Sequence, residues 1–158
     1  MFSKVAVGKE HIAAITKDRR LFTMGTEDHG KLGHDPKVVS EEEAKLEAER
    51  YKKAGYKPGS QERQAASIGY VKGAIEGKAI VAVDCGEAHT VCVTDGGEVF
   101  SWGRGKFGAL GHEATVDVSQ PKKVEGLSDI VDVKCGGDYT LVKDKNGKLY
   151  AFGDNSYG

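Results

Sequence analysis

The feature that most restricts the fold of this chain is a glycine spacing that occurs three times. In each copy a leading glycine is followed by a second glycine 17 residues later and by a third five residues after that. The copies are Gly8, Gly25 and Gly30; Gly86, Gly103 and Gly108; and Gly136, Gly153 and Gly158. Self-similarity at a period of about 50 residues indicates a repeat architecture such as a solenoid or a propeller. The first two copies lie 78 residues apart, so an additional segment separates them.

The residues between the leading and second glycines predict short strands. In the second copy, Ile80–Cys85, His89–Thr94 and residues 98–102 are rich in β-branched and aromatic residues, and Asp95-Gly96 lies between the last two runs. Such runs predict strands, and Asp-Gly between two of them predicts a hairpin. One unit of this kind cannot bury both faces of its sheet. The repeats therefore predict an all-β fold in which small antiparallel sheets stack as propeller blades.

Alternation in the third copy predicts which side chains share a face of a strand. Along residues 130–135, a period of two places Ile130, Asp132 and Lys134 on one face and Val131, Val133 and Cys135 on the other. Both faces of such a strand are expected to be partly covered, because blades stack face to face.

The second copy carries a longer motif in full: Gly-x-x-His-Thr, a hairpin, and then Trp-Gly-x-x-x-x-Gly-x-Leu-Gly. Its residues are Gly86, His89, Thr90, Trp102, Gly103, Gly108, Leu110 and Gly111. This motif resembles the regulator of chromosome condensation repeat. The other copies keep the spacing, with Ile12 in place of threonine, Tyr139 in place of histidine, and Met24 and Phe152 in place of tryptophan. The resemblance implies a propeller held by structural repeat residues, namely Gly8, Gly25, Gly86, His89, Trp102, Gly103, Gly108, Gly111, Gly136 and Gly153.

Members of that family build seven-bladed propellers, which three repeats cannot close. We therefore expect a partial β-propeller of about three four-stranded antiparallel blades with one helical insertion. The remaining blades, or a second copy of the chain, are the expected partners of its open edges.

The predicted organisation is a first repeat at 1–34, an insertion at 35–77, a second repeat at 78–128 and a truncated third repeat at 129–158. Within the insertion, helix formers at about 41–54 follow Ser40, which forms a capping box with Glu43. A return strand is predicted at 69–72, and its counterpart in the second repeat is predicted at 121–125.

Charge and composition exclude several classes of function. The chain has 23 basic and 24 acidic residues and no basic stripe interleaved with aromatic residues, so direct nucleic-acid binding is not expected. Three cysteines in a chain rich in glycine, lysine and glutamate are typical of a reducing compartment, and we expect an intracellular protein, cytoplasmic or nuclear. The absence of Cys-x-x-Cys spacing argues against a zinc or redox site. The N-terminal residues enter the first repeat directly, so neither a signal peptide nor a membrane partner is expected.

Residues of catalytic type have structural interpretations in this pattern. His11 and His89 recur at one repeat position, either as a polar ring on the propeller face or, as their repetition favours, as hydrogen-bonding groups that fix the junctions between blades. Cys85 and Cys135 also share a repeat position and are interpreted as small buried thiols. The Gly-x-Gly-x-x-Gly sequence at 103–108 follows a hairpin instead of a parallel strand, which argues against a dinucleotide site. The sequence predicts no catalytic residue, no metal site and no cofactor.

The loops change between the copies while the glycines stay fixed. The candidate partner-binding residues are Lys9, Glu10, Glu87 and Asp138 in the turns after the leading glycines, and Arg104, Lys106 and Phe107 in the second glycine-rich loop. Exposed loops on a rigid scaffold commonly carry binding function. Neutral variation of solvated loops is the alternative interpretation.

Two functions follow. The lack of a catalytic constellation and the variation of the loops favour a non-enzymatic protein–protein interaction module. The resemblance implies an alternative, because the family's namesake is a guanine-nucleotide exchange factor for the small GTPase Ran and docks on chromatin. On that interpretation Glu87 and Asp138 are the first acids to test. Exchange would then proceed through differential binding and not through bond chemistry.

Overall fold

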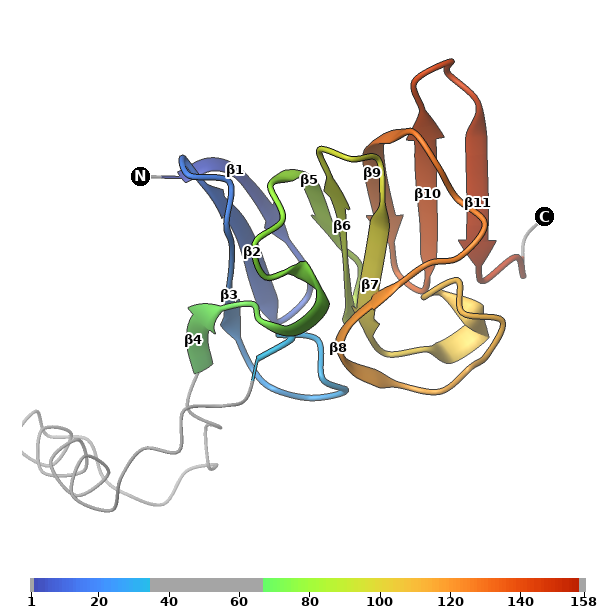
Figure 1. The fold of residues 1–158 in the computed structure, drawn as a ribbon. Helices are drawn as coiled ribbons and strands as arrows, with labels where there is room; N and C mark the ends of the chain where they lie inside the picture. Colours follow the sequence, from blue (N-terminus) through green and yellow to red (C-terminus); the bar gives the residue numbers. More distant parts are fainter. Residues whose placement is uncertain (1, 35–66, 157–158) are drawn as a thin grey trace, which may run out of the picture.

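The computed structural model describes residues 2–34 and 67–156, which form three antiparallel sheets arranged side by side (Figure 1). Blade 1 has the order β1-β2-β3-β4, with strands Phe2–Val7, His11–Thr16, Leu21–Gly25 and Ser67–Tyr70. Blade 2 has the order β5-β6-β7-β8, with strands Ile80–Cys85, His89–Thr94, Val99–Gly103 and Val118–Lys123. Blade 3 consists of β9 (Ile130–Gly136), β10 (Tyr139–Asp144) and β11 (Leu149–Gly153). Single 3-10 turns occur at Gly73–Ile75 (η1) and Lys106–Gly108 (η2).

This architecture confirms the predicted all-β partial propeller. The third blade has three strands in the described part of the chain, one fewer than a four-stranded blade. The predicted helix at about 41–54 lies outside the described residues. The return strand is β4, which pairs with β3 in the register Phe22↔Tyr70 and starts two residues before the predicted position. Its counterpart β8 begins three residues before its predicted start.

The predicted alternation along β9 is wrong at Val131. The register of β9 against β10 shifts between Asp132 and Ile130, so that Val131 forms a bulge. A bulge places two residues opposite one and turns the extra side chain away. Val131 is therefore exposed, whereas Ile130 and Val133 both enter the core between blades 2 and 3. Similar irregularities occur in β1 and β5, so the first strand of every blade bends at the same place.

The apolar core is divided between the two blade junctions. Between blades 1 and 2, buried residues include Ala13, Ile15, Leu21, Cys92, Phe100 and Trp102. Between blades 2 and 3 they include Val91, Val93, Val99, Val124, Val133 and Val142. The two central strands of blade 2, β6 and β7, are buried on both faces because alternate side chains enter different cores. The blades are thus joined mainly by face-to-face burial of apolar side chains.

The glycine-rich loops of blades 1 and 2 each pack against an aromatic residue of the next blade. A Cβ atom on Gly33 would lie 2.6 Å from Trp102 Nε1, and one on Gly111 would lie 2.9 Å from Phe152 Cε2. Both glycines also have positive φ, 69° and 74°, which favours glycine. The glycine of the repeated Leu-Gly pair is therefore required because the loop backbone lies close to an aromatic ring of the next blade. This contact occurs at both blade junctions.

The outward face of blade 1 is apolar and open. Its exposed large side chains include Phe2, Val5, Val7, Ile68 and Tyr70. No helix in the described part of the chain is both long and apolar enough to cross a membrane.

Candidate interaction face

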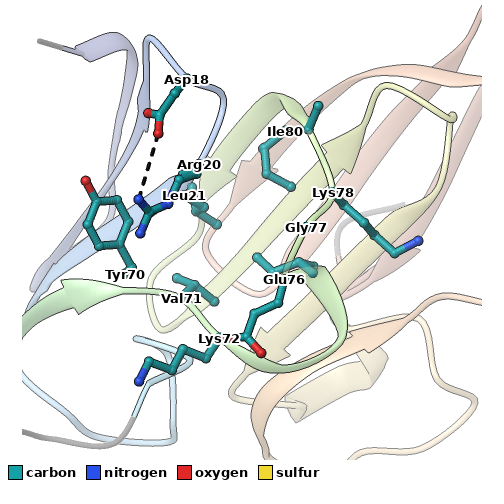
Figure 2. Close-up of a pocket in the computed structure, with 12 residues that line it drawn as sticks. Asp18, Arg20, Leu21, Tyr70, Val71, Lys72, Glu76, Gly77, Lys78 and Ile80 are labelled. Carbon is teal, nitrogen blue, oxygen red and sulfur yellow. Dashed lines mark ion pairs between the residues drawn. The ribbon is translucent and has the colours of Figure 1, made fainter.

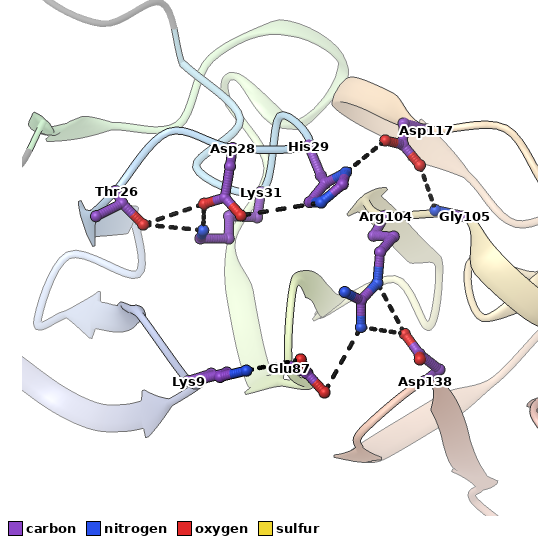
Figure 3. A network of polar contacts seen from close by, with 10 residues as sticks. All are labelled: Lys9, Thr26, Asp28, His29, Lys31, Glu87, Arg104, Gly105, Asp117 and Asp138. Atoms are coloured by element: carbon purple, nitrogen blue, oxygen red, sulfur yellow. Dashed lines mark hydrogen bonds and ion pairs between the residues drawn. The ribbon is translucent and has the colours of Figure 1, made fainter. Parts of the chain in front are cut away.

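The turns after the leading glycines and the glycine-rich loops gather at one end of the three sheets (Figures 1 and 3). In an antiparallel meander the turn between strands one and two and the end of strand three lie at the same end of the sheet. Each blade therefore presents one turn and, in blades 1 and 2, one loop at this end. We call this surface the loop face.

Four of the predicted partner-binding residues form a chain of ion pairs across all three blades (Figure 3). Lys9 Nζ of blade 1 lies 3.1 Å from Glu87 Oε1 of blade 2. Arg104 Nη2 lies 3.7 Å from Glu87 Oε2 and 2.6 Å from Asp138 Oδ1 of blade 3. The hydrogen bond from Lys9 and the positive charge of Arg104 lower the pKa of Glu87. The side chains proposed to contact a partner are thus already paired with one another.

The other three candidates differ in their surroundings. Glu10 is exposed. Lys106 and Phe107 lie in η2, and Lys106 Nζ is 4.5 Å from the centre of the Phe107 ring. Phe107 is 47% exposed and has a φ of 57°. Positive φ is uncommon for a large aromatic residue. The loop backbone at Phe107 therefore determines how this side chain is exposed to solvent.

A second polar contact joins the loops of blades 1 and 2. Asp117 accepts a hydrogen bond from the Gly105 N–H at 3.0 Å, and its other oxygen lies 2.7 Å from His29 Nδ1. Burial alone would raise the pKa of Asp117, but the Gly105 N–H and His29 together lower it. Asp117 therefore acts as a clamp between loops that are distant in sequence.

Lys31 is the most buried cation of the loop face, with 1% of its side chain exposed. Its ammonium group pairs with Asp28 and lies 3.0 Å from Thr26 Oγ1. Burial lowers the pKa of Lys31, against the opposing charges of Glu10 and Glu27. Sequence reasoning missed Lys31, His29 and Asp117. Lys31 could have been found by comparing the copies, because the second copy has alanine, Ala109, at the same repeat position.

Beneath the ion pairs, the repeated histidines connect each blade to the next. His11 Nε2 lies 3.0 Å from Thr90 Oγ1, which donates to the Lys31 carbonyl at 2.7 Å. His89 Nε2 lies 2.9 Å from Thr140 Oγ1, which donates to the Ala109 carbonyl at 2.8 Å. A hydroxyl has one hydrogen, so each threonine accepts from the ring and each histidine is the neutral Nε2–H tautomer.

Burial maintains that neutral form. It lowers the pKa of His11 and of His89 from 6.5 to about 4. The histidines therefore serve the junctions between blades, which is the structural interpretation of their repetition.

The described residues offer little for catalysis. Among residues 2–34 and 67–156, no group of three or more His, Cys, Asp and Glu could hold a metal ion. Burial raises the pKa of the Cys85 thiol to about 12 and also raises the pKa values of Cys92 and Cys135. All three thiols are therefore protonated and poorly nucleophilic at neutral pH.

Replacing Arg104 by glutamine is expected to lower the free energy of unfolding by about 1–2 kcal/mol, because Asp138 loses two charge-assisted hydrogen bonds, at 2.6 and 3.0 Å. The Arg104 and Asp138 side chains are only 20% and 14% exposed, so water compensates poorly. Urea denaturation followed by circular dichroism measures the change. Lys9→Gln is the control, since its pair with Glu87 is largely exposed and should contribute much less to stability. Equal effects of the two variants would contradict this role of Arg104.

Comparison with known proteins gives one family. Models of the regulator of chromosome condensation (RCC1) repeat match residues 96–142 and, separately, residues 80–109 and 130–158. Human E3 ubiquitin-protein ligase HERC2 is 32% identical over 153 residues, which is 94% of this chain and 3% of HERC2.

Solved structures show the same fold. Human WBSCR16 is 26% identical with a TM-score of 0.71, over 99% of this chain and 34% of that one. Prp20p from Saccharomyces cerevisiae, described together with its binding to Gsp1p and histones, is 20% identical with a TM-score of 0.68, over 97% of this chain and 32% of its own. The chain therefore spans about a third or less of the length of each of these proteins.

Proposed function

Because the chain belongs to the regulator of chromosome condensation repeat family, we propose that it is a non-enzymatic protein–protein interaction module whose loop face contacts the partner. The observation that carries this proposal is the charged network across three blades, together with the exposed Phe107 ring three residues after Arg104. Aromatic residues beside charged groups are typical of binding surfaces. The buried junctions supply the rigid scaffold on which such loops commonly bind.

The experiment compares the partners captured by the purified chain and by its variants. Phe107→Ser combined with Lys106→Glu removes the exposed aromatic and reverses its neighbouring charge, without touching a buried core residue. Lys143→Glu on β10 is the control, because it is an exposed substitution away from the loop face. Quantitative mass spectrometry should show partners lost by the first variant and retained by the control. An identical set of partners for wild type and both variants would contradict the proposal.

A guanine-nucleotide exchange factor for a Ran-like small GTPase is the alternative, and chromatin association would accompany it. Its support is the placement of Glu87 and Asp138 on the loop face, together with the binding of Gsp1p and histones by Prp20p. Both acids are held by Arg104, so a basic GTPase side chain would have to compete with it. Release of labelled GDP from Ran measures this function directly. No acceleration by the chain would remove the alternative.

We further propose that blades of the same repeat type, or a second copy of this chain, cover the outward face of blade 1. The exposed Val5 and Val7 side chains and the tilted ring pair of Phe2 and Phe22, with ring centres 5.8 Å apart, support this. Large exposed apolar patches commonly mark interfaces. Light scattering showing a stable monomer would exclude the second copy.

A further inference from the structure

A cavity of about 430 Å³ lies at the junction of blades 1 and 2 (Figure 2), and none of its lining residues belongs to the loop face. It is lined by the segment 71–79, which connects β4 to β5, and by the start of β3. Its apolar lining comes from the buried residues Leu21, Val71, Ile75 and Ile80. Arg20, Tyr70 and Lys72 stand around them. We call this cavity the crossing pocket, and its size is typical of a binding site.

The segment that lines the crossing pocket is longer than its counterpart in the next blade. Nine residues, 71–79, separate β4 from β5, whereas six residues, 124–129, separate β8 from β9. The longer segment contains η1, and its two glycines Gly73 and Gly77 have φ of 82° and 77°. The pocket is therefore built by a sequence feature particular to this junction.

The charge beside the pocket is reversed relative to blade 2. Hydrogen bonds from Thr16 N to Arg20 O and from Thr94 N to Glu98 O show that Arg20 and Glu98 are matched positions. Glu98 forms an ion pair with Lys123 at 3.3 Å. In blade 1, Tyr70 matches Lys123, and the Arg20 guanidinium carbon stacks 3.7 Å from the centre of its ring. The ion pair of Glu98 and Lys123 in blade 2 is thus replaced in blade 1 by Arg20 stacked on Tyr70.

A second matched position changes in the same direction. Val71 and Val124 donate to Leu21 and Val99 respectively, which makes Lys72 the counterpart of the acidic Glu125. The lining also contains Lys78, which pairs with Glu98 at 2.7 Å, and the acids Asp18 and Glu76. Asp18 lies 3.8 Å from Arg20, with both side chains more than half exposed, so this pair leaves Arg20 largely available.

We propose that the crossing pocket binds an acidic peptide segment of a protein partner, with one apolar side chain in the cavity and flanking carboxylates on Arg20 and Lys72. The apolar lining side chains are buried, whereas both cations are exposed. The apolar group and the anionic groups of the ligand must therefore occupy different positions along one chain. Arginine stacked on an aromatic ring keeps its N–H groups free in plane for a carboxylate.

The test is an NMR titration of the ¹⁵N-labelled chain with capped pentapeptides. The probe has one phenylalanine between two pairs of aspartates, and serine replaces the phenylalanine in the control peptide. We expect saturable shifts of the amide signals of residues 71–79, with a dissociation constant on the order of 0.1–1 mM. The double variant Arg20→Glu and Lys72→Glu, which copies the charges of blade 2, should weaken binding at least tenfold. Lys148→Glu alters the matched position in blade 3 outside the cavity and should leave binding unchanged.

Three results would overturn the proposal. Equal binding of the serine peptide would show that the cavity is not used. An equal loss in the Lys148→Glu variant would show an effect of net charge alone. Benzoate binding as tightly as the peptide, with the same sensitivity to Arg20 and Lys72, would assign the pocket to small organic anions. The loop-face variant Phe107→Ser should leave the titration unchanged, so failure of the proposed function and failure of this inference are distinguishable.

Discussion

Replacing Trp102 by alanine is expected to lower the free energy of unfolding by about 3–5 kcal/mol, which is a large part of the stability of a domain of this size. The side chain is 0% exposed and is part of the core between blades 1 and 2. Its ring also covers Gly33 of the neighbouring loop, so truncation leaves a cavity at the junction. Urea denaturation followed by far-UV circular dichroism measures the loss, because Trp102 is the only tryptophan and fluorescence would disappear with it.

Met24 provides the matched control for this prediction. It occupies the same repeat position in blade 1 but is 37% exposed, so Met24→Ala should cost less than about 1 kcal/mol. Trp102→Phe is expected to recover much of the loss, because Phe152 occupies this position in blade 3 and packs on Gly111 in the same way. Similar destabilisation by Trp102→Ala and Met24→Ala would show that the blade junction does not carry the stability.

Acidification from pH 6.5 to pH 4 is expected to destabilise the fold through His11 and His89. Burial lowers the pKa of each ring from 6.5 to about 4, so the unfolded chain binds more protons than the folded one throughout this range. Their contribution is fully present above pH 6.5 and is lost as the pH falls to 4. A shift of this size corresponds to about 3 kcal/mol per histidine. Melting temperatures measured between pH 7.5 and pH 4 by circular dichroism test the prediction.

The double variant His11→Gln and His89→Gln separates the histidines from the carboxyl groups that also titrate. Glutamine retains an N–H donor for Thr90 and Thr140 but does not ionise. We expect lower stability at pH 7.5 and a flatter pH profile between 6.5 and 4 than in the wild type. Parallel profiles for wild type and variant would mean that other groups cause the acid sensitivity.

Local patterns in the sequence were sufficient to predict the strands, the hairpins and their grouping into blades. Glycine spacing and alternation are local properties, and the second copy follows them closely, since β5 and β6 have the predicted bounds. Alternation failed at Val131 because a bulge depends on how β9 pairs with β10, and nothing in the pattern marks the extra residue.

The sequence predicted individual residues of the candidate site but not the ion pairs that connect them. Lys9, Glu87 and Asp138 were selected as exposed and variable, yet Arg104 links the last two and Lys9 pairs with Glu87 across 78 residues of sequence. Asp117 was missed because its partners Gly105 and His29 come from other segments. Lys31 pairs with Asp28 of its own loop and was missed because the sequence does not show that its side chain is buried.

The sequence alone thus determined the repeat, the blade as its unit, and the glycines that each copy requires. These depend on backbone conformation and on burial within about 50 residues, which every copy encodes for itself. Only the tertiary structure decided which charged groups neutralise one another, which histidine tautomer joins the blades, and where a cavity opens beside segment 71–79. Those features depend on the distance between side chains of different blades, and that distance is set by how the sheets stack.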